Sequence, residues 1–307
     1  MRPDSDATVG IRIPGDGVTG VLLQRVVTAI VLIAGLVLVS VFASPFAFAL
    51  AVALITILCS MEWTRFIGLS DLRGRAGYVF SITAMVAGGF FLTGVFPRAE
   101  FLDSFRVLTL MLFGLLFWIL AIWLMIGYPR NARYWNEQSH LALMGVFVLV
   151  PTWSGVVQLK YLDPDGGLVL ALIAMVSVAD IGAYFAGRAW GRKKLAPNLS
   201  PGKSWAGFWG GMASCVLLTA LILLATANRA VELNGLQILL VLLGAMLVSI
   251  SSVVGDLFES MMKRNRQLKD SGTVLPGHGG ILDRLDSLTA ATPVAVLWLF
   301  LVLRAAG

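Results

Sequence analysis

Long apolar runs separated by short polar segments extend over most of the 307 residues of this chain. Each run approaches the roughly 20 residues that an α-helix needs to cross a bilayer. Helices are expected, because lipid offers no partner for open backbone groups and the runs lack the period-two pattern of a barrel. The predicted fold class is all-α, a polytopic membrane protein of about nine transmembrane helices. The expected ranges are 26–42, 46–63, 78–96, 107–128, 141–159, 168–187, 205–227, 237–254 and 288–303.

The same pattern divides the chain into three parts. Residues 1–20 are polar, rich in Gly, Asp and Pro, and without periodicity, so a flexible cytoplasmic tail is expected there. Residues 21–167 carry about five of the predicted spans, and residues 168–307 carry about four. The last part is the expected catalytic region, because it holds both polar segments that are longer than a turn, 188–204 and 258–287.

Basic residues are distributed unevenly between alternate loops. Of the 23 Lys and Arg, 18 fall on the side of the N-terminus and five on the other side. Cytoplasmic loops carry the excess of Lys and Arg in membrane proteins. A cytoplasmic N-terminus is therefore expected, with both long polar segments facing the cytoplasm, where nucleotides are available. The expected location is the cell (cytoplasmic) membrane, with the active site on its cytoplasmic side.

Composition excludes some classes of protein. Hydrophobic residues make up 58% of the chain and charged residues 13%, and the net charge is +6. The positive-inside distribution accounts for that charge, so no nucleic-acid partner is expected. Cys59 and Cys215 both lie within apolar runs and are expected to be small buried hydrophobes rather than a disulfide or a metal site.

The segment 260–286 is a polar island in this apolar chain. Its five basic residues face three Asp residues, and Asp256 and Glu259 just upstream make the charges balance. A simple anchor for anionic lipid would carry one sign of charge. The balance favours a site that holds a metal and a phosphate together.

Two pairs of carboxylates flank the island. Asp256 and Glu259 are three residues apart at the end of the eighth expected span, and Asp283 and Asp286 are three apart just before the ninth. In a helix each pair projects from one face. Mg2+ prefers oxygen ligands and keeps water or substrate phosphates in its other positions, so two or three carboxylates suffice. The alternative is that each pair is a solvated helix end matched by Lys or Arg.

A glycine-rich turn precedes the second pair. Gly277, Gly279 and Gly280 surround His278. Glycines at a helix start allow close approach of a ligand, and the free N–H groups there favour an anion, so a phosphate is expected beside the metal. A phosphate monoester is already ionised near neutral pH, so His278 is expected to bind or position phosphate rather than act as a base. A turn without a ligand stays the alternative.

Upstream, an acidic residue lies inside a span and a polar loop follows. Asp180 is expected to face a wet cavity, because an ionisable group costs about 2.5 kcal/mol or more in lipid; the alternative is an ion pair with Arg188. Ser200, Lys203 and Ser204 have the chemistry of a phosphate loop, but the usual spacing is absent and no preceding strand is expected. Ser204 is equally suited to cap the following helix.

The polar island resembles the signature of phosphatidate cytidylyltransferases, also called CDP-diacylglycerol synthases. The segments DIGAYFAGR and LSPGKSW also resemble that family, so the resemblance covers residues 180–287. The family often has an acidic residue where this chain has Ala206. The matching residues of the island are Ser260, Lys263, Arg264, Lys269, Asp270, Pro276, His278, Gly279, Gly280, Asp283, Arg284 and Asp286.

The resemblance implies transfer of a cytidylyl group from CTP to phosphatidic acid, giving CDP-diacylglycerol and pyrophosphate. It also implies a homodimer in the lipid bilayer and Mg2+ as cofactor, and it leaves a second, monovalent cation open. The implied metal ligands are Asp256, Asp283 and Asp286. Catalytic roles are expected for these three and for Lys263, Arg264 and His278. The expected substrate-binding residues are Asp180, Ser200, Lys203, Ser204, Lys269, Gly279, Gly280 and Arg284.

Two other functions stay open at this point. One is a CTP-dependent membrane kinase or a synthase acting on an isoprenoid-ether lipid. The other is a cation or phosphate transporter with Asp180 on its path. The transporter is disfavoured, because the ionisable residues cluster at one surface and a transport path needs some of them near the midplane of several spans.

Overall fold

The computed structural model describes residue 28 and residues 30–305, with gaps at 32, 227–232 and 276–278. Within this part of the chain, eight helices are long and apolar enough to cross a membrane. The all-α polytopic class is thereby confirmed. The expected tail 1–20 lies outside the described residues, and residues 33–42 of the first expected span are helical. The eight helices are α2 (Pro45–Ile67), α3 (Leu72–Thr93), α4 (Ser104–Gly127), α5 (Gln138–Leu162), α6 (Gly167–Trp190), α7 (Trp205–Thr226), α8 (Gly235–Asn265) and α9 (Leu282–Arg304).

Local side-chain chemistry sets where several helices begin and end. The Oδ2 atom of Asp71 accepts the N–H of Gly74 at 2.7 Å and caps α3, and Ser44 caps α2 in the same way. Both helices end at a glycine in the left-handed region, Gly68 with φ 82° and Gly94 with φ 79°. These caps satisfy backbone groups that a helix end leaves open, so the short loops follow directly from the sequence.

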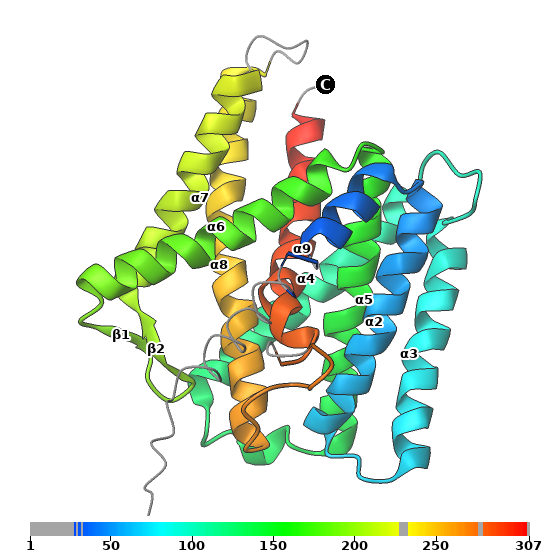
Figure 1. The fold of residues 1–307 in the computed structure, drawn as a ribbon, viewed down its shortest axis with the longest axis vertical. Coiled ribbons are helices and arrows are strands. Elements are labelled where there is room, and N and C mark those ends of the chain that lie inside the picture. The colour runs from blue at the N-terminus through cyan, green and yellow to red at the C-terminus, as the bar shows by residue number, and fades with distance from the viewer. Residues whose placement is uncertain (1–27, 29, 32, 227–232, 276–278, 306–307) are drawn as a thin grey trace, which may run out of the picture.

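Helix α5 occupies the middle of the bundle. It packs against α2, α4 and α9, while α6 packs mainly against α7 and runs obliquely across α8 towards α9 and α5 (Figure 1). Helix α8 packs against both α7 and α9 and so connects the two parts. Cys59 and Cys215 are buried free thiols, as expected.

An aromatic cluster holds the polar end of α8 in place. The ring of Phe258 lies 6.5 Å from that of Trp63 on α2 and 5.6 Å from that of Phe117 on α4. All three side chains are buried, and aromatic pairs at such distances stabilise a contact beyond the area they bury. The end of α8 therefore has a fixed position relative to two helices of the N-terminal half.

Helix α8 is longer than the sequence predicted. It continues past residue 254 to Asn265, so the expected cytoplasmic loop 258–287 is in part helical, and the connection to α9 is only residues 266–281. Asn234 and Gln237 form a capping box at its start. Lys263 and Arg264 lie in its last turn, where positive charge complements the helix dipole. Hydropathy finds the membrane-spanning part of such a helix and not its polar extension.

The connection between α6 and α7 contains a short hairpin that the sequence did not predict. Strands β1 (Lys194–Ala196) and β2 (Ser200–Ser204) pair antiparallel, with Lys194 opposite Ser204. Strands this short give little period-two signal. The hairpin places the Ser200–Ser204 segment beside α8.

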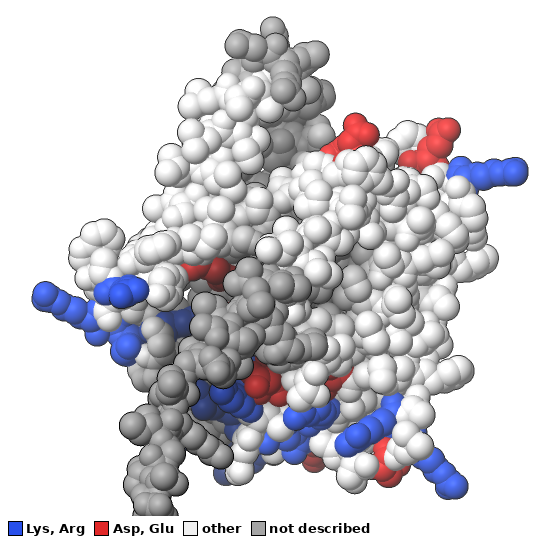
Figure 2. All heavy atoms as spheres, viewed as in Figure 1, with Lys and Arg blue, Asp and Glu red and all other residues white. Residues whose placement is uncertain are grey.

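Most of the charged residues lie towards the two ends of the bundle. In Figure 2, most of the visible Lys and Arg lie at the lower end and beside the hairpin. Figure 1 shows that α2 and α8 finish at that end and that the chain climbs from there to the start of α9. The loops there are those that the charge distribution predicts on the cytoplasmic side.

Candidate active site

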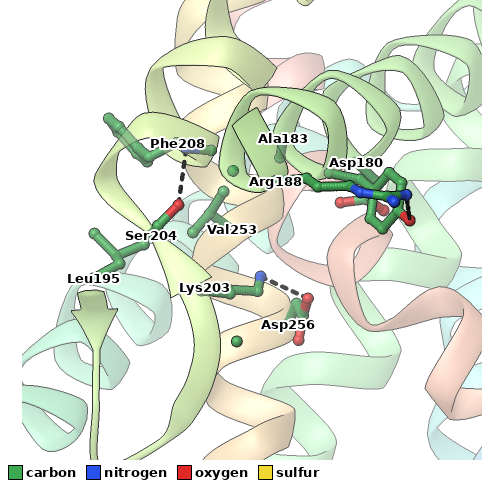
Figure 3. A pocket seen from close by; sticks show the side chains of 13 residues that line it. Asp180, Ala183, Arg188, Leu195, Lys203, Ser204, Phe208, Val253 and Asp256 are labelled. Carbon is green, nitrogen blue, oxygen red and sulfur yellow. Dashed lines mark hydrogen bonds and ion pairs between the residues drawn. The ribbon is translucent and has the colours of Figure 1, made fainter. Parts of the chain in front are cut away.

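A cavity of about 450 Å³ opens between α6, the hairpin, α7 and α8 (Figure 3). Its volume is in the range of small-molecule sites. Two basic and two acidic side chains line it, together with small and apolar residues. The charged ones are Asp180, Arg188, Lys203 and Asp256. The structure thus brings together residues from three separate segments that the sequence singled out.

Lys203 and Asp256 connect the hairpin to α8. The Nζ atom of Lys203 lies 2.5 Å from Oδ2 of Asp256, and both side chains are partly exposed to the cavity (Figure 3). Ser260, one turn further along α8, donates to Oδ1 of Asp256 at 3.4 Å. This ion pair leaves the lysine at the cavity wall, where it can exchange its partner for a phosphate.

Ser204 caps α7, which is one of the two roles that the sequence predicted for it. Its Oγ accepts the N–H of Gly207 at 3.2 Å. The side chain is 5% exposed, and the residue lines the cavity. The capping bond uses one lone pair of the hydroxyl, so its proton stays available to a ligand. Ser200 lies at the start of β2 and pairs with Ala196.

Asp180 faces the cavity, as its place in an apolar span predicted. Arg188 lines the same cavity, but its Nη1 donates to the hydroxyl of Tyr184 at 3.2 Å. Among the ion pairs of the described residues, none joins Arg188 to Asp180. Of the charged groups around Asp180, Lys203 has the strongest electrostatic effect on its carboxyl group. The alternative of an Asp180–Arg188 ion pair is therefore not what the structure shows.

Beyond the cavity, Lys263 bridges two buried carboxylates. Its Nζ donates to Oε2 of Glu259 at 2.8 Å and to Oδ1 of Asp283 at 2.7 Å. The exposed fractions of the side chains of Lys263, Glu259 and Asp283 are 18%, 4% and 6%. Buried charges are tolerated only when they are paired and hydrogen-bonded, so the three groups depend on one another.

Asp286 completes the acidic cluster from the first turns of α9. Glu259 on α8 and Asp256, one turn before it, are the acidic groups that act on its carboxyl group. Glu259 Oε1 is buried and has no hydrogen-bond donor among the described residues. Neighbouring ionised carboxylates repel each other, so a proton or a cation between them would stabilise this cluster.

The start of α9 differs from the expected phosphate cradle. The N–H of Gly280 donates to Oδ2 of Asp283 at 2.8 Å, and the N–H groups of Ile281 and Leu282 donate to the carboxylate of Glu62 at 2.9 and 2.8 Å. These three amides are occupied by carboxylates of the chain itself. Gly279 has φ 84°, a conformation that glycine adopts without strain.

The other predicted residues lie around this cluster. Lys269 and Arg284 are exposed at the same end of the molecule, and Arg264 is exposed with its Nε 3.5 Å from the carbonyl oxygen of Leu199. That contact links α8 to the hairpin. His278 lies outside the described residues.

Sequence reasoning missed two groups at the site, Glu62 on α2 and Ser271 in the loop before α9. Oδ2 of Asp283 accepts from both the N–H and the hydroxyl of Ser271, each at 2.9 Å, and the same hydroxyl lies 3.1 Å from Glu62. Glu62 is an acidic residue inside an apolar span. The rule that identified Asp180 would also have identified Glu62.

The donor set fits Mg2+ of the kind that substrate phosphates help to hold. Among the residues that the structure describes, no three His, Cys, Asp or Glu side chains are grouped as in a preformed metal cage. Proteins commonly bind Mg2+ through one or two carboxylates plus substrate phosphates. The carboxylates of Glu259 on α8 and Asp286 on α9 suit that arrangement. Oε1 of Glu259 has no hydrogen-bond donor among the described residues, and Asp256 lies one turn before Glu259 on the same helix. The oxygens of Asp283 already have donors from Lys263, Ser271 and Gly280.

These features define a polytopic helical membrane protein with a polar, phosphate-compatible site at one end of the bundle. The chain matches the profile of the Cytidylyltransferase family over residues 23–302. It therefore belongs to the cytidylyltransferase family.

Two full-length relatives support this assignment. The phosphatidate cytidylyltransferase of Pseudomonas aeruginosa is 41% identical over 280 residues, which are 90% of this chain and 97% of the relative. The phosphatidate cytidylyltransferase of Haemophilus influenzae is 40% identical over 297 residues, 92% of this chain and 100% of the relative. A more distant enzyme of the same name, from Bacillus subtilis, is 33% identical over 57% of this chain and 64% of its own length. The similarity thus includes the N-terminal spans, for which the motifs gave no information.

Proposed function

We propose that this protein transfers the cytidylyl group of CTP to phosphatidate and produces CDP-diacylglycerol and pyrophosphate. Family membership and the names of its full-length relatives support this reaction. The main support from the structure is the position of Asp256 between the cavity and the carboxylate cluster. Asp256 pairs with Lys203 on the cavity side and is a neighbour of Asp286 on the other. A nucleotide in the cavity would have its phosphates beside both Lys203 and the carboxylate cluster.

The chain's own residues would bind and orient the two phosphate-bearing substrates. Lys203 and Arg188 at the cavity wall are placed to hold the triphosphate of CTP, with Ser204 as a neutral donor. The ionised phosphate oxygen of phosphatidate attacks the α-phosphorus of CTP, and the bond to the pyrophosphate leaving group breaks. No general base is needed, because the nucleophile is already ionised. Lys263 is placed to stabilise the negative charge that develops on the phosphoryl oxygens.

We also propose that Mg2+ is required, with Asp256 and Asp286 as ligands, Glu259 beside them, and Asp283 as a further ligand through the lone pair of Oδ1 that Lys263 leaves unused. When bound, the ion neutralises charge on the nucleotide and on the leaving pyrophosphate. The acidic side chains that would face it lie at the ends of α8 and α9 and are held by Lys263 and by the loop before α9.

The proposed setting is the cytoplasmic membrane. The end that carries the cavity, the carboxylate cluster and most of the basic loops would face the cytoplasm, in keeping with the positive-inside rule. Phosphatidate keeps its acyl chains in lipid, so the reacting atoms must meet at the headgroup plane. The proposed assembly is a homodimer, which the mass of the purified protein in detergent tests.

Incorporation of labelled CTP into lipid tests the proposal directly. Purified protein in phosphatidate-containing vesicles should form labelled CDP-diacylglycerol and release an equal amount of pyrophosphate with Mg2+, and neither product after chelation with EDTA. Isoprenoid-ether phospholipid and diacylglycerol serve as alternative acceptors. Movement of ions across liposomes without release of pyrophosphate would overturn the enzyme assignment in favour of a transporter.

A further inference from the structure

Glu62 is a buried carboxylate on α2, far in sequence from the polar island. Its residue is 4% exposed, and Trp63 beside it is anchored by donation from Nε1 to the carbonyl of Leu141 at 2.9 Å. A buried carboxylate costs several kcal/mol unless it is well supplied with donors. Among the ion pairs of the described residues, none involves Glu62. Its donors among the described residues are polar groups without charge.

Those donors are the first amides of α9 and the serine of the preceding loop. Ile281 donates to Oε1 at 2.9 Å, Leu282 donates to Oε2 at 2.8 Å, and the hydroxyl of Ser271 lies 3.1 Å from Oε2. Helix α9 has no capping hydrogen bond from the side chain at its own N-cap, Ile281. Glu62 thus caps α9 from another helix, and the positive end of the helix dipole favours its negative charge.

Two glycines provide the space for this carboxylate. A Cβ atom at Gly280 would lie 2.5 Å from Oε2 of Glu62, and one at Gly272 would lie 2.3 Å from Oε1. Gly280 must therefore lack a side chain so that Glu62 and Ser271 can approach it. This requirement does not depend on a bound phosphate.

Two arginines tie the same end of α2 to the rest of the loop. Arg65, one turn after Glu62, donates from Nη1 to the carbonyl of Ser271 at 2.8 Å. Arg266 donates to the carbonyls of Phe66 and Ile67 at 2.7 and 2.8 Å. The end of α2 therefore holds the connection 266–281 near both of its ends.

This network reaches the carboxylate cluster through Ser271. The serine hydroxyl lies 3.1 Å from Glu62 and 2.9 Å from Oδ2 of Asp283, whose Oδ1 accepts from Lys263. The hydroxyl carries a single proton and serves one carboxylate at a time. Displacing Glu62 would therefore change both the first turn of α9 and the orientation of Asp283.

We infer that Glu62 is a positioning residue for the cytidylyl transfer: it caps α9 from α2 and fixes the Asp283–Lys263 pair in its reactive orientation. The inference rests on the proposed role of that pair in catalysis. It assigns to the N-terminal half of the protein a direct part in shaping the active site. Glu62 itself touches neither substrate.

The test replaces Glu62 with Gln, which keeps the size of the side chain but puts an N–H group against an amide that needs an acceptor. We expect kcat to fall by about 10- to 100-fold, because a displacement of about 1 Å can cost 100-fold, while KM for CTP stays within about threefold. Hydrogen exchange in the peptide 279–285 should become faster. Glu100→Gln, at an exposed position, is the matched control and should leave all three values unchanged.

A second variant perturbs the same carboxylate from its other side. Gly272→Ala should reproduce the fall in kcat and the faster exchange, since its Cβ would displace Oε1 of Glu62. If neither variant folds, exchange in the wild-type protein decides, because amides bonded to Glu62 must exchange far more slowly than those of an open loop. Rapid exchange there would overturn the inference.

Wild-type kcat in a folded Glu62→Gln protein would also overturn it. Asp283→Asn distinguishes the positioning role of Glu62 from the proposed catalytic role of Asp283. If that variant is inactive while Glu62→Gln is fully active, the positioning role is wrong and the proposed catalytic role of Asp283 stands. If Asp283→Asn is also active, the proposed site itself is wrong.

Discussion

Lys203 on the α6–α7 hairpin lies 2.5 Å from Asp256 on α8, although 53 positions separate them in the sequence. The contact joins the cavity wall to the helix that carries the acidic cluster. A basic residue held by a carboxylate at a cavity mouth can turn to a phosphate when the substrate arrives, while the carboxylate becomes available to a cation. The pair therefore links nucleotide binding to the proposed metal site.

Replacing Lys203 with Ala should act mainly on CTP. We expect KM for CTP to rise about tenfold, since a charge-assisted hydrogen bond is worth about 1.5–3 kcal/mol, with a smaller effect on kcat. Initial rates of pyrophosphate release at varied CTP concentration measure both constants. Lys194→Ala, at an exposed position of the partner strand β1, is the control. An unchanged CTP dependence in Lys203→Ala would remove the hairpin from the site.

Asp286→Asn should abolish turnover, with a loss of at least about 100-fold expected for an electrostatic group acting on the transition state. The neutral amide removes one of the negative charges of the Glu259–Asp286 pair, and the affinity of the site for a cation should fall as a result. Product formation across a Mg2+ titration measures the effect, and thermal unfolding establishes that the fold is retained. Asp165→Asn, exposed at the other end of the bundle, provides the comparison. Activity within a few-fold of wild type would contradict the metal assignment.

Lys263→Met should destabilise the protein as well as reduce its activity. It leaves Glu259 and Asp283 buried without a cation, which costs roughly 3–5 kcal/mol when one partner of a buried pair is removed. Thermal or denaturant unfolding in detergent measures the change in the free energy of unfolding. The exposed pair Arg106–Asp103 offers a contrast, because Arg106→Met should cost only about 1 kcal/mol. Equal losses in the two variants would argue against a buried network.

Gly280→Ala should disrupt the start of α9. Its Cβ would lie 2.2 Å from the hydroxyl oxygen of Ser271 and 2.7 Å from the backbone N atom of Gly272, both closer than a Cβ atom can approach without displacing its neighbours. We expect a loss of activity and a lower unfolding temperature. Gly77→Ala on α3 is the counterpart, because an added Cβ there meets no described atom within 4 Å, and Ala should stabilise the helix by up to about 1 kcal/mol. A fully active Gly280→Ala enzyme would show that this packing is not needed.

The amino-acid sequence determined the class of fold and most of the chemically active residues. Apolar runs of bilayer length require helices, and eight of the nine expected spans correspond to helices of the required length and composition in the described residues. Charged residues in an apolar chain are conspicuous, so Asp180, Lys203, Asp256 and the polar island could be recognised from their types and spacing. The polar extension of α8 and the hairpin could not, because neither has a strong periodic signal.

Only the tertiary structure decided which groups meet. The sequence pattern shows that a carboxylate is present but not which distant donor satisfies it. Glu62 and the amide of Leu282 are 220 positions apart, and their bond depends on how the end of α2 meets the end of α8 and the start of α9. The same packing brings Lys263 and Ser271 to the carboxylate of Asp283 as donors. It leaves Oε1 of Glu259, near Asp286, without a donor among the described residues. Burial makes each unpaired charge costly, so the final arrangement is set by the donors that the folded helices bring together.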